Sequence, residues 1–262
     1  MRGLAGNVDA DVQGLRRSGA LALANRAAAL GAVVMFGLFV ATWAQFVLTS
    51  GTANFGVDYT LYHDAGARWL NGDGFYLPHQ LAGPYQVTHG DVLYPPPFLL
   101  LLVPFQALPA VLWWVIPIGV VVWIVVTWRP GGIAWLLIAA CIFYPVTGVK
   151  LIHGNPGIWI AAAIALGTRY AWPSVLVLIK PTVFPFALIG IWSRRWWLAL
   201  AGMAGVSLLF LPMWRDYIVV LMNAEASSTL LYSLNEVPML AIPVIAWIGH
   251  GPRWRRQRDL EP

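Results

Sequence analysis

The sequence predicts an all-α fold, a polytopic transmembrane helical bundle of about eight spans. Hydrophobic residues make up 59% of the 262 residues and charged residues only 10%, whereas soluble domains carry about a quarter of charged residues. The mean hydropathy is +0.69. Apolar runs recur along the chain, several of them long enough to cross a bilayer, and turn-forming residues separate them. These three observations argue against a water-soluble fold.

The charge distribution indicates a membrane rather than nucleic acid as the partner. The formal net charge is +5 and the isoelectric point is near 9.6, but the basic residues gather beside apolar segments, as they do on cytoplasmic membrane flanks. The single cysteine, Cys141, allows no intrachain disulfide. No small-residue cleavage site follows the first apolar run, which is therefore expected to be an uncleaved first helix.

The clearest span covers residues 27–48, which at 1.5 Å per residue cross a hydrocarbon core of about 30 Å. Residues 49–95 are polar and are expected to form one external loop. Residues 96–127 are apolar again, but prolines interrupt them, so they form either one kinked helix or two short ones. The later apolar stretches lie at 133–148, 157–172, 174–192, 196–213 and 237–249.

Two helices within 96–127 give eight spans and put most basic residues on the inner side. The residues then expected inside are Arg2, Arg16, Arg17, Arg26, Lys150, Arg194, Arg195, Arg253, Arg255, Arg256 and Arg258, and those expected outside are Arg68, Arg129, Arg169 and Arg215. The prediction is a cytoplasmic tail over 1–26, a transmembrane domain over 27–249 and a basic cytoplasmic tail over 250–262. The protein is expected in the cell inner (plasma) membrane.

All eleven acidic residues fall outside the apolar stretches, which disfavours an ion-coupled transporter because such proteins usually need ionisable groups within their helices. Internal repeats typical of transporters are also absent. Any carboxylate-dependent reaction is therefore expected at the outer membrane face. Lys180 is expected to be the only charge deep in a span, with an anion from elsewhere, such as a lipid phosphate, as its partner. Snorkelling to the inner surface is the alternative.

The external loop begins with helical spacing. Asp58, Tyr62, Ala65 and Trp69 recur at i, i+4, i+7 and i+11, which predicts an amphipathic helix lying on the membrane with Asp58 at its start. Asp58 is a candidate catalytic carboxylate, and a helix N-cap is the alternative because Asp is a preferred capping residue.

Two other polar features have open interpretations. His153 and Asn155, in the helix-breaking KLIHGNPG segment, either hydrogen-bond a ligand or cap the next helix. The histidines and aspartates of the external loop match no metal-ligand spacing, so neither a metal nor another cofactor is predicted. These loop residues are His63, Asp64, His79, His89 and Asp91.

Taken in order, short elements of the chain resemble the family-87 glycosyltransferases, also described as DUF2029 membrane proteins, which are GT-C enzymes. The matching elements are Asp58-x3-Tyr62-x2-Ala65, Gly74-Phe75-Tyr76, Tyr94-Pro95-Pro96, Gly154-Asn155, and Lys180-Pro181 ahead of Arg194-Arg195-Trp196. They cover roughly residues 27 to 213. The family includes mannosyltransferases that use polyprenyl-phosphate-mannose.

The resemblance implies a hexosyltransferase that moves a sugar, mannose in the first instance, from polyprenyl phosphate to a lipid or glycan acceptor outside the membrane. It implies Asp58 as general base, Lys180 or Arg68 offsetting charge on the departing phosphate, and substrate contacts from Tyr62, Tyr94, His153 and Asn155. No metal is required for a lipid-phosphate leaving group.

The chain departs from the family in two ways. Family members are usually longer, with more spans, so a partner membrane chain is one expectation. The chain also has HGN where many relatives have Gln after the Gly. The alternative function is a truncated, non-catalytic relative that binds lipid-linked sugar or a membrane partner, and a transporter is a third.

Overall fold

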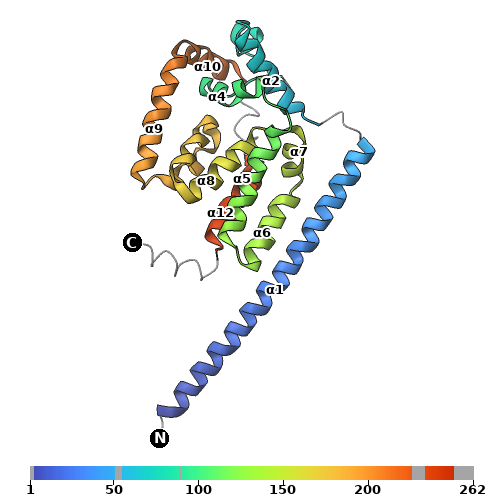
Figure 1. Ribbon diagram of the computed structural model, residues 1–262, viewed down its shortest axis with the longest axis vertical. Helices are drawn as coiled ribbons and strands as arrows, with labels where there is room; N and C mark the ends of the chain where they lie inside the picture. The colour runs from blue at the N-terminus through green and yellow to red at the C-terminus, as the bar shows by residue number, and fades with distance from the viewer. Residues whose placement is uncertain (1–2, 51–54, 89, 226–233, 251–262) are drawn as a thin grey trace.

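The computed structural model describes residues 3–50, 55–88, 90–225 and 234–250, and within them the chain is all-helical with no strand (Figure 1). Only two isolated bridges, Tyr85 with Ala224 and Pro130 with His250, are strand-like. The predicted all-α class is confirmed. The basic tail predicted at 250–262 lies outside the described residues apart from His250.

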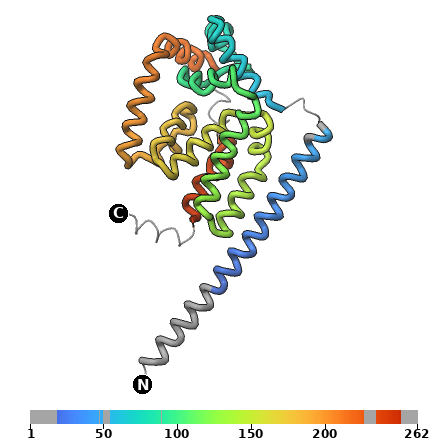
Figure 2. The backbone as a smooth tube through the Cα atoms, viewed as in Figure 1, coloured from blue at the N-terminus to red at the C-terminus, as the bar shows by residue number. Residues whose placement is uncertain are grey.

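The first helix, α1 (Gly3–Ser50), is 48 residues long, which corresponds to about 72 Å. It includes most of the predicted N-terminal tail as well as the first span. In Figures 1 and 2 it runs along one side of the bundle and extends beyond its lower end. Its main packing partner is α6 (Gly132–Phe143), where Gly31 faces Leu136.

Short helices cover one end of the bundle. They are α2 (Val57–Leu70), α3 (Pro78–Ala82), η1 (Pro96–Phe98), α4 (Leu99–Leu102) and η2 (Val103–Gln106). Pro96 and Pro104 each stand within the first two residues of a new short helix, because proline cannot continue a preceding α-helix. Gln106 at the end of this run donates to the His63 carbonyl of α2. Residues 96–106 therefore pack beneath α2 instead of forming the first of two predicted spans.

The core of the bundle is α8 (Gly157–Tyr170), against which α5 and α12 pack. Its small buried residues, among them Ala161 and Ala165, allow close approach of the neighbouring helices. The other bundle helices are α5 (Leu112–Trp128), α6, α7 (Pro145–His153) and α12 (Val237–Ile248).

The predicted span 174–192 is a hairpin of two 3-10 helices, η3 (Trp172–Ile179) and η4 (Pro181–Gly190). Ser174 donates to the Ala187 carbonyl at 2.9 Å, and a methyl group at Gly190 would lie 2.5 Å from the Ala171 carbonyl oxygen. The two legs are therefore antiparallel, with Lys180 at the tip. The chain returns to the end from which it started and continues into α9 (Arg194–Ser207), η5 (Leu208–Phe210) and α10 (Leu211–Asn223).

Two helical stretches of the described chain are long and apolar enough to cross a membrane, namely Gly19–Phe46 and Arg194–Asn223. The pair Gly132–Phe143 and Pro145–His153, bent by 62°, makes a third if it counts as one span. The remaining apolar helices are shorter, so helix length and composition do not show eight crossings.

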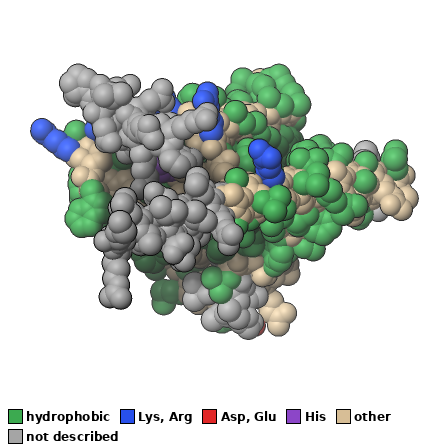
Figure 3. Space-filling model, turned by 90° about the horizontal axis from the view of Figure 1, so that it is seen from below, with side chains coloured by type: hydrophobic (Ala, Val, Ile, Leu, Met, Phe, Trp, Pro, Cys, Tyr) green, Lys and Arg blue, Asp and Glu red, His purple; other side chains and the backbone are tan. Residues whose placement is uncertain are grey.

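Contacts divide the bundle into two ends. At the first end, the Asn25 side chain accepts a hydrogen bond from the Ile133 amide. The Trp128 ring lies 5.6 Å from the His250 ring between centroids, and the Trp128 indole donates to the Thr168 hydroxyl. We call it the basic end, because Arg26, Arg129 and Arg169 directly follow Asn25, Trp128 and Thr168. The start of α9, with Arg194 and Arg195, joins this end, because Trp196 and Ala171 both pack against Gly190. Figure 3, seen from below, shows several Lys and Arg side chains there among hydrophobic ones.

The opposite end carries α2, α3 and α10, with Asp58, Asp64, Asp73, Asp91, Asp216, Glu225 and Glu236. Lys150 also lies there, because it pairs with Glu236 at 3.1 Å. The predicted sides of Lys150, Arg129 and Arg169 are therefore inconsistent with these contacts. The reason is that residues 96–106 stay beside α2 and that the hairpin returns to the basic end, so neither segment changes the end at which the chain lies. Each of these two segments was counted as one crossing, and each therefore reverses the side predicted for the residues that follow it. After the hairpin the two reversals compensate, so Arg26, Arg194 and Arg195 share an end as predicted.

Candidate functional site

Asp58 lies in the first turn of α2, and its carboxylate is held by a residue from another part of the chain. The Asn155 side-chain amide donates to Asp58 Oδ2 at 2.6 Å, and the Asp58 side chain is 15% exposed. The N-cap of α2 is Gly56, in a left-handed conformation with φ 74°, and no side-chain cap is present. The alternative that Asp58 is the N-cap is therefore wrong, although the helix N-terminus still favours its negative charge.

Asn155 is fixed by the turn between α7 and α8. Helix α7 ends at Gly154, whose φ of 69° is left-handed, and the Trp113 indole donates to the Gly154 carbonyl at 2.7 Å. Asn155 Oδ1 accepts at 2.9 Å from the amide of Gly157, the first residue of α8, which is the type of contact that the capping interpretation predicts, although the N-cap position itself is Pro156. The amide nitrogen of the same side chain donates to Asp58 and orients its carboxylate. A ligand contact by Asn155 stays a prediction.

His153 borders this pair. Its Nδ1 is 4.0 Å from Asp58 Oδ1, and its side chain is 31% exposed. The distance is too long for a hydrogen bond, so His153 lies beside Asp58 without holding its carboxylate.

Aromatic rings form the neighbouring wall. Tyr94 stacks on Phe98 with centroids 4.2 Å apart, and Tyr62 meets Tyr94 edge-on at 5.3 Å. Lys180 Nζ lies 5.7 Å from the Tyr94 ring centroid, within cation–π range. Tyr76 donates to the Tyr94 carbonyl at 2.9 Å. Burial raises the pKa of Tyr76, so it stays protonated and remains a donor.

A buried charge cluster lies on the other side of Lys180. Glu236 Oε2 is 2.5 Å from Lys180 Nζ, and Glu236 Oε1 is 3.1 Å from Lys150 Nζ. The exposed fractions of these side chains are 12% for Lys180, 5% for Lys150 and 0% for Glu236. Burial alone would raise the pKa of Glu236, which precedes α12, but the two lysines outweigh burial and lower it, so the group is a carboxylate.

This cluster corrects two expectations. The partner of Lys180 is Glu236 of the same chain rather than an anion from elsewhere, and Lys180 is not the only deeply buried charge. The sequence predicts Lys150 on the inner side, and Glu236 follows Arg215 in the segment between the stretches 196–213 and 237–249, which the eight-span prediction assigns to the outer side. The available signal was Glu236 standing immediately before the apolar stretch 237–249, where a carboxylate at a helix start sits close to the membrane interior.

Gly157 joins the two parts of the site. A methyl group there would lie 3.0 Å from Asn155 Oδ1, 3.1 Å from Glu236 Oε2 and 2.8 Å from Met239 Cε. Asp58 and Asn155 are thus continuous with the charge cluster, and the site draws on α2, α7, α8, α12 and the hairpin tip. Of the predicted residues, the structure brings together Asp58, Tyr62, Tyr94, His153, Asn155 and Lys180.

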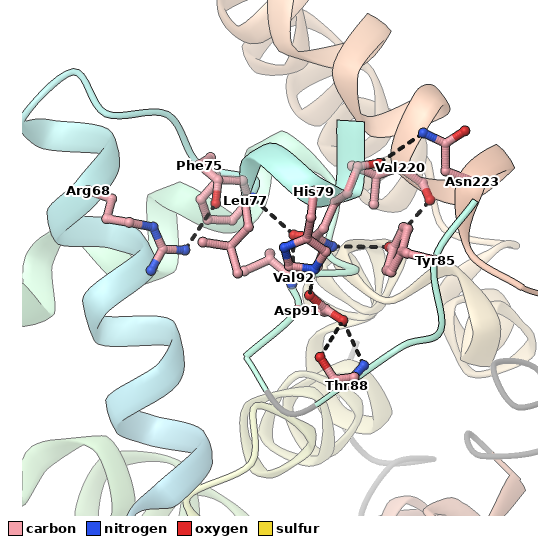
Figure 4. A network of polar contacts seen from close by, with 11 residues as sticks. Arg68, Phe75, Leu77, His79, Tyr85, Thr88, Asp91, Val92, Val220 and Asn223 are labelled. Carbon is pink, nitrogen blue, oxygen red and sulfur yellow. Dashed lines mark hydrogen bonds and ion pairs between the residues drawn. The ribbon is translucent and has the colours of Figure 1, made fainter. Parts of the chain in front are cut away.

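Arg68 is the predicted residue that lies apart. Its Nη2 donates to the Phe75 carbonyl at 3.4 Å (Figure 4), and with Asp64 it lines a separate hollow of about 430 Å³ on α2. Arg68 therefore does not join Lys180 near Asp58.

Figure 4 also shows how the segment between α2 and η1 is fixed to α10. His79 contacts Asp91 at 2.7 Å, and the Asn223 side chain donates to the Gln80 carbonyl at 3.0 Å. Within the described part of the chain, no three His, Cys, Asp or Glu side chains gather as a metal site would require. His89 lies outside it.

An apolar cavity of about 720 Å³ lies between α1, α5, α6, α8 and α12. Met239 and Ile158 line it next to Gly157, and Leu151 lines it next to Lys150. Its wall therefore reaches the polar site.

Comparisons of the chain with protein-family models, with curated proteins and with solved structures gave no match. The functional argument accordingly depends on the site itself.

Proposed function

We propose that the chain is a multi-pass membrane glycosyltransferase of the GT-C type. It transfers a sugar, mannose in the first instance, from a polyprenyl-phosphate donor to a lipid or glycan acceptor. The observation that carries the proposal is the convergence of Asp58, Asn155, Tyr94 and Lys180 at one end of the bundle. These residues come from distant parts of the sequence, and the fold brings them to one end of the bundle.

In the proposed reaction Asp58 is the general base. Its carboxylate takes the proton of the acceptor hydroxyl while that oxygen attacks the anomeric carbon. The bond from the anomeric carbon to the phosphate oxygen breaks, and its electron pair leaves with the polyprenyl phosphate. Lys180 offsets the charge that develops on that phosphate, and attack opposite the leaving group inverts the anomeric configuration.

The apolar cavity supports a lipid-linked donor. Its lining is almost wholly hydrocarbon, and it adjoins the charge cluster at Gly157. A molecule with a long apolar chain and an anionic head matches this combination, because the chain is buried by the hydrophobic effect while the head meets the lysines.

The two ends of the bundle support a topology with both termini in the cytoplasm. The basic end, with Arg26, Arg129 and Arg169, fits the cytoplasmic side. The hairpin starts from the basic end and returns to it, because Ser174 bonds to Ala187 and Gly190 lies against Ala171, so it adds no net crossing. We accordingly propose six crossings and one re-entrant hairpin in place of eight spans, with α1, α5, α6, α8, the α9–α10 helix and α12 crossing.

The test is transfer by the purified full chain. The protein in detergent is incubated with radiolabelled polyprenyl-phosphate-mannose and a membrane lipid extract, and labelled lipid is separated by chromatography. We expect a product with the wild type and at least a hundredfold less with Asp58→Asn, since general-base catalysis contributes about 10² to 10⁴. Asp64→Asn, on the same helix with its side chain 62% exposed, is the matched control and should keep full transfer.

Other outcomes contradict the proposal in different ways. A wild type that binds the donor without transferring its sugar indicates the non-catalytic relative. An Asp58→Asn variant as active as the wild type would remove the catalytic role from Asp58.

A further inference from the structure

The cluster of Lys150, Glu236 and Lys180 has an arrangement that the proposed function does not use. Each Glu236 carboxylate oxygen contacts a different ammonium, Oε1 that of Lys150 and Oε2 that of Lys180. The three side chains come from α7, the start of α12 and the tip of the η3–η4 hairpin. All three are nearly excluded from solvent, so their formal charges act at low effective dielectric.

The charge count distinguishes this trio from an ordinary buried ion pair. One lysine with one glutamate is neutral and would attract no anion. The second lysine leaves the trio with a net charge of +1, buried among apolar residues. A buried net charge of this kind is unfavourable. The nearby Asp58 carboxylate is bonded to Asn155, so an anion bound beside the trio relieves that cost.

We infer that Glu236 and Lys150 set the charge and position of the anion site, with Glu236 holding the Lys180 ammonium beside Tyr94 and Lys150 keeping the trio positive towards the donor phosphate. Lys180 is the most exposed of the three at 12%, so it meets the phosphate directly. Lys150, at 5% exposure, acts through Glu236 and is a positioning residue. The inference rests on the proposed function in identifying the anion as the phosphate of a lipid-linked sugar.

The experiment changes the charge in steps while leaving Lys180 in place. Lys150→Met makes the trio neutral, Glu236→Gln makes it +2, and the double variant returns it to +1 with an amide oxygen still able to accept from Lys180. The probe is polyprenyl phosphate without sugar, titrated into the full-length protein in detergent. Arg194→Met, which removes a cation at the basic end, is the control and should leave the affinity unchanged.

We expect the dissociation constant to rise about tenfold or more in Lys150→Met, since a unit charge several ångströms away has at least this effect at an effective dielectric near 20. The double variant should return to within about threefold of the wild type. Glu236→Gln should bind at least as tightly as the wild type, yet its kcat with polyprenyl-phosphate-mannose should fall because repulsion from Lys150 displaces Lys180.

If the trio had only a structural role, the double variant would not recover affinity and would bind polyprenyl phosphate as weakly as the worse single variant. That result would overturn the inference. If Lys150→Met does not fold, Glu236→Gln is compared with the wild type, and weaker binding by the variant at +2 than by the wild type at +1 would overturn the inference. If the wild type transfers sugar but the dissociation constants of the variants do not follow the charge of the trio, only this inference is contradicted. A wild type that does not bind polyprenyl phosphate defeats the proposed function as well.

Discussion

At the residue scale, the Asp58–Asn155 hydrogen bond is the contact on which the proposed chemistry depends most directly. A 2.6 Å bond from an amide to a carboxylate is charge-assisted and stronger than a neutral one. It fixes the direction in which Asp58 presents its other oxygen. A general base must lie within hydrogen-bond reach of the proton that it takes, so this orientation matters as much as the carboxylate itself.

Removing the amide should therefore lower catalysis without removing the base. We predict that Asn155→Ala lowers kcat by about tenfold to hundredfold, because Asp58 then samples orientations that do not face the acceptor. The measurement is the rate of mannose transfer at saturating donor. Asn25→Ala removes an amide of the same type at the basic end, where Asn25 accepts from Ile133, and should leave kcat unchanged. Equal rates for both variants would show that Asn155 does not orient Asp58.

The sequence predicted individual site residues better than their partners. Asp58, Asn155 and Lys180 could be selected because each is a polar residue at a helix start, a helix break or within an apolar run. Tyr62 and Tyr94 were selected from the family resemblance. The contact between Lys180 and Glu236 joins residues 56 positions apart, and no local periodicity encodes such a pair.

At the scale of elements, the α7–α8 turn determines where Asn155 lies. Gly154 has φ 69°, which a residue with a side chain adopts only at a cost. A methyl group there would also lie 2.5 Å from Trp114 Cζ2 and 3.0 Å from Tyr59 Cβ. The position requires glycine for both conformational and steric reasons.

We predict that Gly154→Ala destabilises the protein by about 1–2 kcal/mol for the left-handed backbone alone, with a further cost for the contact with Trp114. The apparent melting temperature in detergent should fall. Gly202→Ala in α9 is the matched control, since nothing lies within 4 Å of that position and alanine is the better helix former by about 1 kcal/mol. A Gly154→Ala variant as stable as the control would contradict this description of the turn.

Element existence was easier to predict than element length. The amphipathic helix near Asp58 is present as α2 because its apolar face is regular. The runs 96–106 and 172–190 are as apolar as true spans, but prolines divide them into short helices that turn back. Hydropathy indicates that a segment favours an apolar environment, but it does not determine how far the segment extends across a membrane.

At the scale of the whole molecule, the arrangement of the ends predicts accessibility. The proposed topology assigns Arg129 to the cytoplasmic side and Asp64 to the outer side, whereas eight spans would have both outside. We predict that Arg129→Cys, in a Cys141→Ala background, is labelled by a membrane-impermeant maleimide only after the cells are opened. Asp64→Cys should be labelled in intact cells and serves as the positive control. Labelling of both variants in intact cells would favour eight spans over six.

The position of Glu236 has a consequence for how the chain is made. Lys180 leaves the ribosome 56 residues before Glu236, which at 5–20 residues per second is about 3 to 11 s. During that interval the hairpin tip has no carboxylate to neutralise it, and a lone ammonium is costly in hydrocarbon. In the proposed topology, the re-entrant hairpin is therefore expected to settle into the bilayer only after α12 has emerged, so that biogenesis of the site ends with this helix.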